Sequence, residues 1–244
     1  MTRMRVMAAA WAVATCGAGA AEAEPIGVLY PQVSVVSDYR YYGVSNSNLE
    51  PTAQLSLYLW RPDGLYAGVF SSGVDFLIPD GPSFELDLYA GRNIEMGRTT
   101  LTFEGMASLF PDNEAAGPTL NFYQAVGKLS RSHGALTIGA EAAWTPAAPS
   151  NAGERWRLQA NAGYAAADWL SFEARYGSLD SERGQDRRYW EVGAVASRGP
   201  LALDVRYAGT DLEPSECFFT DWCEPGLVGK LTYNLPFGGW GQRR

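Results

Sequence analysis

The chain has 244 residues, of which 46% are hydrophobic and 19% are charged, and its formal net charge is -8. This apolar content excludes a disordered chain, and the acidic balance argues against nucleic acid as a partner, because phosphate contacts need a clustered basic surface. His133 is the only histidine, which excludes mechanisms that need two imidazoles, most zinc sites included. We therefore expect no metal, no cofactor and no enzymatic activity.

The N-terminus has the order of a secretory signal peptide. Two arginines precede an apolar stretch over residues 6–16, and the small residues that follow fit cleavage after Ala20 or after Ala23. No later segment approaches the ~18 consecutive apolar residues that a membrane helix requires. We predict a signal peptide over residues 1–23 and one exported domain over residues 24–244.

From Val33 onward, apolar or aromatic side chains alternate with small or polar ones. In residues 52–59, for example, alanine and leucine occupy every second position, and threonine, glutamine, serine and tyrosine occupy the others. Alternation of period two indicates strands with two unlike faces. Twelve segments have this pattern: 33–43, 52–59, 65–69, 84–90, 101–105, 120–129, 136–144, 156–162, 170–176, 190–194, 201–207 and 231–237.

The connections between these segments alternate in length. Tight turns such as residues 61–64 and 131–134 alternate with longer, more polar or proline-containing loops such as 110–118, 146–154, 179–188 and 211–226. Short turns at one rim and long loops at the other are typical of outer-membrane barrels. We predict an all-β fold: a transmembrane up-and-down antiparallel β-barrel of about twelve strands, with both termini at the periplasmic, short-turn rim. A soluble β-sandwich or a lipocalin-like barrel also alternates and is the alternative fold.

Charged residues lie within many segments on the face opposite the apolar one. In a soluble barrel these charges would face outward into water, whereas in a membrane barrel they would line the lumen, and the alternation alone does not separate the two cases. On the membrane interpretation, the lumen-lining residues are Asp38, Arg40, Glu85, Asp87, Glu104, Lys128, Glu141, Arg157, Glu173, Arg175, Glu191, Asp204, Arg206 and Lys230.

Aromatic residues near the segment ends favour the membrane barrel. Rings at the ends of an apolar face match the interfacial girdles of outer-membrane barrels, whereas a soluble core would place them near the middle of each strand. The expected girdle residues are Tyr39, Tyr41, Trp144, Trp156, Tyr176, Trp190, Tyr207 and Phe237.

Two cysteines, Cys217 and Cys223, lie close together in the last long loop. In an exported chain such a pair is expected to form a disulfide, which contributes roughly 2 kcal/mol if it is unstrained. A metal pair is the alternative, but it lacks nearby histidines or further thiolates. We therefore predict a disulfide and no metal site.

Residues 37–45 read Ser-Asp-Tyr-Arg-Tyr-Tyr-Gly-Val-Ser, and residues 85–91 read Glu-Leu-Asp-Leu-Tyr-Ala-Gly. These stretches resemble the "SDYrfRGiS" and "ElDlYgG" segments of the TorF-type putative porin family. The resemblance covers the first quarter of the mature chain, and Tyr42 stands where the family often has arginine. It implies an outer-membrane β-barrel regarded as a porin, and it supplies no catalytic residue.

The predicted function is a channel in the bacterial outer membrane that passes small polar or ionic solutes passively through a charged lumen. Its partners would be outer-membrane lipid and the solute, and opposed charges in the lumen would give a slight cation preference. The alternative is a closed structural or adhesion barrel whose lumen is plugged by arginine–carboxylate pairs. The sequence predicts neither the solute nor the oligomeric state.

Overall fold

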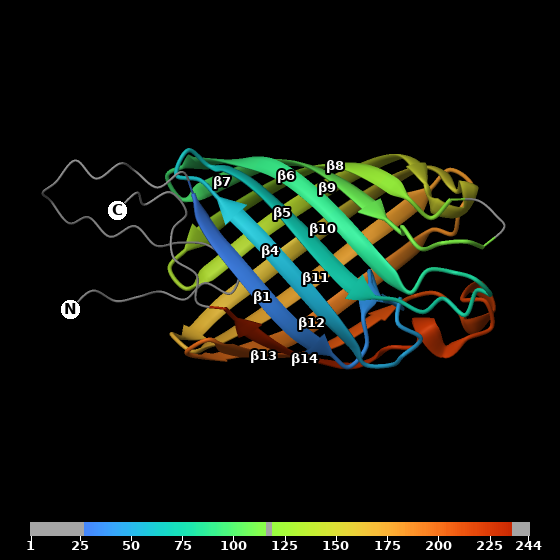
Figure 1. Cartoon of the computed structure of the whole chain (residues 1–244). Helices are drawn as coiled ribbons and strands as arrows, with labels where there is room; N and C mark the ends of the chain where they lie inside the picture. Colours follow the sequence, from blue (N-terminus) through green and yellow to red (C-terminus); the bar gives the residue numbers. More distant parts are fainter. Residues whose placement is uncertain (1–26, 116–118, 236–244) are drawn as a thin grey trace, which may run out of the picture.

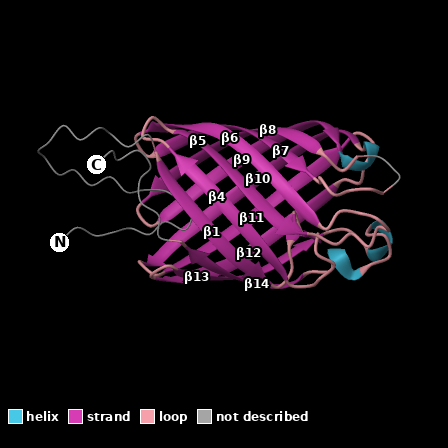
Figure 2. Ribbon diagram, viewed as in Figure 1, coloured by secondary structure: helices cyan, strands magenta, loops and turns pink. Residues whose placement is uncertain are grey.

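The computed structural model describes residues 27–115 and 119–235. These residues form strands joined by turns, loops and three short 3-10 helices (Figure 2). The strands are β1 (Val28–Val36), β2 (Arg40–Tyr41), β3 (Val44–Ser45), β4 (Thr52–Trp60), β5 (Leu65–Gly73), β6 (Phe84–Met96), β7 (Thr99–Leu109), β8 (Phe122–His133), β9 (Leu136–Ala148), β10 (Gly153–Ala167), β11 (Leu170–Ser181), β12 (Arg187–Arg198), β13 (Leu201–Thr210) and β14 (Gly226–Asn234). The 3-10 helices are η1 (Pro149–Asn151), η2 (Pro214–Glu216) and η3 (Asp221–Cys223).

Twelve strands form one closed antiparallel barrel in which sequential neighbours pair and β1 pairs with both β4 and β14 (Figure 1). The strands are inclined to the barrel axis, as closure of a sheet requires. Tight turns join the strands at one rim, where β1 also begins and β14 ends, and the longer loops and the 3-10 helices lie at the other rim. The predicted fold class and strand number are therefore confirmed.

The apolar side chains of the strands face outward. On β10, Leu158 is 55% exposed while Arg157 before it is 3% exposed, and on β13 the exposed Leu203 alternates with the inward Asp204. Leaving a large apolar side chain in water costs about 1.5–3 kcal/mol, so an exterior with this many leucines, valines and aromatic rings requires lipid. This orientation excludes the lipocalin-like alternative, whose apolar face would point inward.

No helix within the described ranges is long and apolar enough to cross a membrane.

The aromatic girdle is confirmed in part. Five of the expected residues face outward: Trp144, Trp156, Tyr176, Trp190 and Tyr207. The rings of two of them meet across adjacent strands, since Trp156 pairs with Trp144 and their centroids are 6.4 Å apart. The prediction for Tyr39 and Tyr41 was wrong, because both rings lie inside the barrel, and Phe237 lies outside the described residues.

The first strand differs most from its expected position. It spans Val28–Val36, not residues 33–43, because the alternation after Val36 belongs to a separate hairpin. Pro31, which cannot donate a ladder hydrogen bond, obscured the true beginning of the strand. Its position is tolerated because, among the described residues, the ladder of β1 with β14 begins at Gln32, and Pro31 takes part only as an acceptor, through its carbonyl oxygen, from the backbone nitrogen of Leu235.

The barrel wall is also taller on one side than the sequence indicated. The expected loops around residues 146–154 and 179–188 are largely strand, so that only residues 149–152 and 182–186 remain as connections. As a result β8 to β12 have 12 to 15 residues each, whereas β1, β4, β5 and β14 have 9.

Replacing Leu158 by arginine tests the lipid-facing exterior. We expect Leu158→Arg to lower the free energy of unfolding in lipid vesicles by about 2–4 kcal/mol, the cost of a cationic side chain near the bilayer midplane. Asn161→Arg on the inward face of the same strand is the matched control, and it should cost much less. Equal losses in denaturant titrations of the two variants would contradict an outward lipid face.

Candidate channel lumen and its folded-in loop

Twelve of the fourteen predicted lumen residues lie on barrel strands and point inward, opposite the exposed apolar positions. They are Glu85 and Asp87 on β6, Glu104 on β7, Lys128 on β8, Glu141 on β9, Arg157 on β10, Glu173 and Arg175 on β11, Glu191 on β12, Asp204 and Arg206 on β13, and Lys230 on β14. Asp38 and Arg40 do not lie on the barrel wall. They belong to the loop between β1 and β4, which folds into the lumen.

Arg206 is the centre of the largest charge cluster in the lumen. Its guanidinium forms ion pairs with Asp204 on its own strand, with Glu191 at 3.0 Å and with Glu173 at 3.4 Å. Arg175 adds a second cation, with its Nε 3.5 Å from Glu191. The contact with Glu173 spans β12, which is possible only because the side chains converge inside the barrel.

Two further pairs continue the charged lining around the barrel. The Lys128 amine lies 3.1 Å from Glu104, and the Tyr66 hydroxyl donates a hydrogen bond of 2.7 Å to the same carboxylate. Arg157 pairs with Glu141 on the neighbouring strand. The Lys128 side chain keeps 37% of its surface exposed, so this part of the lumen is open to solvent.

The carboxyl groups of β6 have no such cationic partner in the described part of the chain. None of the ion pairs within residues 27–115 and 119–235 includes Glu85, Asp87 or Lys230. Glu85 is 1% exposed, and Glu85 Oε2 and Asp87 Oδ1 have no hydrogen-bond partner among the described residues. One wall of the lumen thus carries two adjacent carboxyl groups, and the cations lie on other strands.

The loop between β1 and β4 folds into a hairpin made of β2 and β3, which we call the lumen hairpin (residues 38–47). Its turn residues Tyr42 and Gly43 have φ values of 50° and 86°, which match a tight hairpin turn with both central residues in the left-handed region. A Cβ atom at Gly43 would lie 2.5 Å from the carbonyl oxygen of Gly209 on β13. Glycine therefore lets the turn approach the barrel wall closely.

Three tyrosines of the lumen hairpin pack against different parts of the wall. The Tyr39 ring lies 5.9 Å from that of Phe70, and the Tyr41 ring lies 6.2 Å from that of Phe122. The Tyr42 ring lies against that of Tyr189 on β12 in a tilted arrangement, with ring centroids 4.9 Å apart, and the guanidinium carbon of Arg157 lies 4.5 Å from the Tyr42 ring centroid. The hairpin therefore extends across the lumen and narrows it.

Burial keeps the phenol groups of the lumen hairpin neutral. Removal from water raises the pKa of Tyr41 to about 12, although the nearby arginines act in the opposite direction. The same desolvation, together with the carboxylates Glu85 and Asp87, raises the pKa of Tyr39 well above its usual value. The hairpin therefore presents neutral rings between the arginines of one wall and the buried carboxyl groups of the other.

Polar contacts hold the lumen hairpin in position. Asp38 accepts hydrogen bonds from Arg40 at 2.5 Å and from Ser45 at 2.6 Å, which ties the two sides of the hairpin together. Arg40 also donates to the carbonyl oxygen of Glu224 at 2.7 Å, and Arg187 donates to the carbonyl oxygen of Tyr41 at 3.1 Å. Charge-assisted bonds of this kind contribute about 1.5–3 kcal/mol each.

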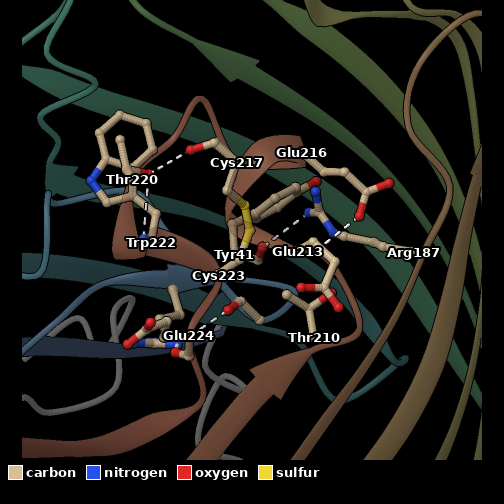
Figure 3. Close-up of a disulfide and its surroundings, with 12 residues drawn as sticks. Tyr41, Arg187, Thr210, Glu213, Glu216, Cys217, Thr220, Trp222, Cys223 and Glu224 are labelled. Atoms are coloured by element: carbon tan, nitrogen blue, oxygen red, sulfur yellow. Dashed lines mark hydrogen bonds between the residues drawn. A yellow bond between two sulfur atoms is a disulfide. The ribbon is translucent and has the colours of Figure 1, made fainter.

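The loop after β13 (residues 211–225) lies against this hairpin, as Figure 3 shows. The disulfide between Cys217 and Cys223 closes a tight turn of the loop, in which the Thr220 hydroxyl donates to the carbonyl oxygen of Cys217 at 2.6 Å. The indole of Trp222 donates to Asn48 at 3.0 Å. This loop, which we call the disulfide loop (residues 211–225), therefore supports Asn48, which directly follows the lumen hairpin.

Sequence reasoning missed several residues of this site. The lumen hairpin was assigned to a strand, although the adjacent tyrosines at 41 and 42 break the alternation and Tyr42-Gly43 is a turn signal. Arg155 and Arg187 fell just outside the expected strand limits. Both are partly exposed and occupy inward positions on β10 and β12.

Other chemistry is not evident at this site. The described part of the chain contains no group of three or more histidine, cysteine, aspartate or glutamate side chains that could hold a metal ion. His133 ends β8 at the tight-turn rim, exposed, with its Nδ1 3.4 Å from Arg98.

A closed barrel with an apolar exterior and a charged interior defines the class of outer-membrane β-barrel proteins. Among solved structures, the KdgM porin in complex with disordered oligogalacturonate has a TM-score of 0.57 at 6% identity, over 87% of this chain and all of that chain. The NanC porin has a TM-score of 0.58 at 10% identity, over 85% of this chain and all of that chain. Both likenesses establish the fold.

Within this class, the chain belongs to the family Gcw_chp, described as bacterial proteins of unknown function, whose model matches residues 20–229. No curated protein matches the sequence.

The Arg206 cluster should be needed for the stability of the barrel. Arg206→Gln leaves three carboxylates without their shared cation, so we expect a loss of up to about 3–5 kcal/mol in the free energy of unfolding. Arg188→Gln removes the same charge from an exposed pair with Asp180, and it should cost less than about 1 kcal/mol. Guanidinium titrations of both variants measure the difference, and equal stabilities would show that the cluster contributes nothing.

Proposed function

We propose that the protein is a channel of the bacterial outer membrane that passes small polar or ionic solutes by passive diffusion. The observation that carries this proposal is the combination of a lipid-facing apolar exterior with an interior lined by charges on β6 to β14. Charged walls attract ions and replace part of their hydration as they pass. The proposal includes export through a signal peptide over residues 1–23, which lie outside the described residues, and membership of the TorF-type putative porins.

The solute class would be small, because twelve strands leave a narrow lumen and the lumen hairpin narrows it further. One structural neighbour, the KdgM porin, is in complex with oligogalacturonate, a chain of acidic sugars. The inward arginines on β10 to β13 would favour the passage of acidic or other polar molecules through this barrel. The proposed passage includes no catalytic step.

A closed barrel is the second candidate, and the lumen hairpin is the observation that favours it. The rings of Tyr39, Tyr41 and Tyr42 reach separate parts of the wall, and the ion pairs fill part of the remaining space. A barrel with this filling would act through its outer loops, for example as a structural or adhesion protein.

Recording from planar bilayers separates the two candidates. We expect the purified protein to give discrete conductance steps in potassium chloride, and the triple variant Tyr39→Ala, Tyr41→Ala, Tyr42→Ala to give steps several-fold larger because three rings leave the lumen. The matched control replaces Phe218 and Phe219 by alanine. These residues lie on the disulfide loop, outside the lumen, and are 80% and 84% exposed. The control should conduct like the unaltered protein.

The outcomes decide between channel and closed barrel. A silent membrane at high protein loading with both the unaltered protein and the triple variant would contradict the channel. A silent unaltered protein with a conducting triple variant would show that the lumen hairpin closes an otherwise open barrel. Migration on gels with and without heating verifies that each variant is folded.

A further inference from the structure

A group of arginines lies on the wall opposite β6, beside the lumen hairpin. Arg157 on β10, Leu179 on β11 and Arg187 on β12 form one row across three paired strands. Arg155 lies two residues from Arg157 on the same inward face, nearer the rim of the long loops. Leu179, which is 1% exposed, is the apolar residue between Arg157 and Arg187 in this row.

The charges of Arg155 and Arg187 are not compensated, whereas that of Arg157 is. Arg157 pairs with Glu141, but no ion pair within residues 27–115 and 119–235 includes Arg155 or Arg187. Arg155 donates its Nε hydrogen to Ser181 at 3.0 Å, and Arg187 donates to the carbonyl oxygen of Tyr41. The Nε of Arg187 has no hydrogen-bond partner in the part of the chain that the structure describes.

The acidic residues labelled in Figure 3, Glu213, Glu216 and Glu224, belong to the disulfide loop, and none of them forms an ion pair with Arg187 among the described residues. Glu216 accepts a hydrogen bond of 2.9 Å from the backbone nitrogen of Glu213 as part of a capping box that begins η2. The two uncompensated carboxyl groups of the lumen wall, Glu85 and Asp87, lie on β6, well separated along the sheet from β10 and β12. Two guanidinium groups with free donors thus remain beside the hairpin.

We propose that Arg155 and Arg187 form an oxyanion-binding site at the outer end of the lumen, which holds the carboxylate or phosphate group of a small solute. The planar guanidinium presents paired donors that match both groups in a bidentate geometry. The site depends on the proposed channel only for the onward passage of the solute, and binding itself requires no open pore. At this level of the lumen the charge favours anions, against the slight cation preference expected from the sequence.

Calorimetric titration of the folded protein in neutral detergent with citrate and, separately, with inorganic phosphate tests the site. We expect at least one of the two anions to bind the unaltered protein. The double variant Arg155→Gln, Arg187→Gln should bind that anion with an affinity at least about tenfold lower, because charge-assisted hydrogen bonds are lost. Comparing the two anions shows which oxyanion is preferred. The single variants should each weaken binding several-fold, which keeps the test valid if the double variant does not fold.

Arg188→Gln is the matched control, because Arg188 follows Arg187 on β12 and pairs with Asp180. It should leave binding unchanged. The proposal is overturned if neither anion binds the unaltered protein, or if the arginine variants bind as tightly as Arg188→Gln does. Bilayer recordings on the same preparation test the two proposals separately. Anion binding without conductance would contradict the channel but support the binding site. Conductance without anion binding would support the channel but contradict the binding site.

Discussion

Closure of the hydrogen-bond ladder is the constraint on which the rest of the structure depends. In lipid, an unpaired backbone N–H or C=O group costs several kcal/mol, so a sheet can cross the membrane only without free edges. Here β1 supplies the closure by pairing with β4 on one side and with β14 on the other. Once the ladder is closed, the alternation of side chains sends one set to lipid and the other to the lumen, where charged groups can be solvated or paired.

Period-two alternation predicted the strand number and the lumen face well, because both follow from the local direction of successive side chains. It failed after Val36, since residues 37–41, in the first half of a hairpin inside the barrel, alternate as a barrel strand does. Only the turn signal Tyr42-Gly43 distinguishes this hairpin from a barrel strand. The need for glycine at this turn becomes clear only in the folded barrel, where the turn approaches Gly209 of the wall. Strand ends were also misplaced, because proline and polar residues near 149–152 and 182–186 suggested longer loops than the barrel has.

The pairing of lumen charges could not be predicted from the sequence at all. Arg206 and Glu173 are separated by a whole strand in the sheet, and they meet because the barrel curves their side chains toward one another. The same curvature places Arg155 and Arg187 beside the hairpin with no carboxylate partner. Whether an arginine has a carboxylate partner depends on the register between strands and on closure of the barrel. The alternation pattern of a single strand predicts neither of them.

The lumen hairpin and the barrel wall differ in how firmly they are held. Each wall strand is hydrogen-bonded to a neighbouring strand on both sides, so that opening the wall would expose many backbone groups to lipid. The hairpin is held instead by neutral ring contacts and by a few bonds such as those from Arg187 and Arg40, each contributing about 1.5–3 kcal/mol. Any change in the width of the lumen therefore comes from movement of the hairpin against a fixed wall. Arg187 donates one of these bonds from its Nη2, while its Nε has no partner among the described residues, so the guanidinium that holds the hairpin still has a donor for an anion.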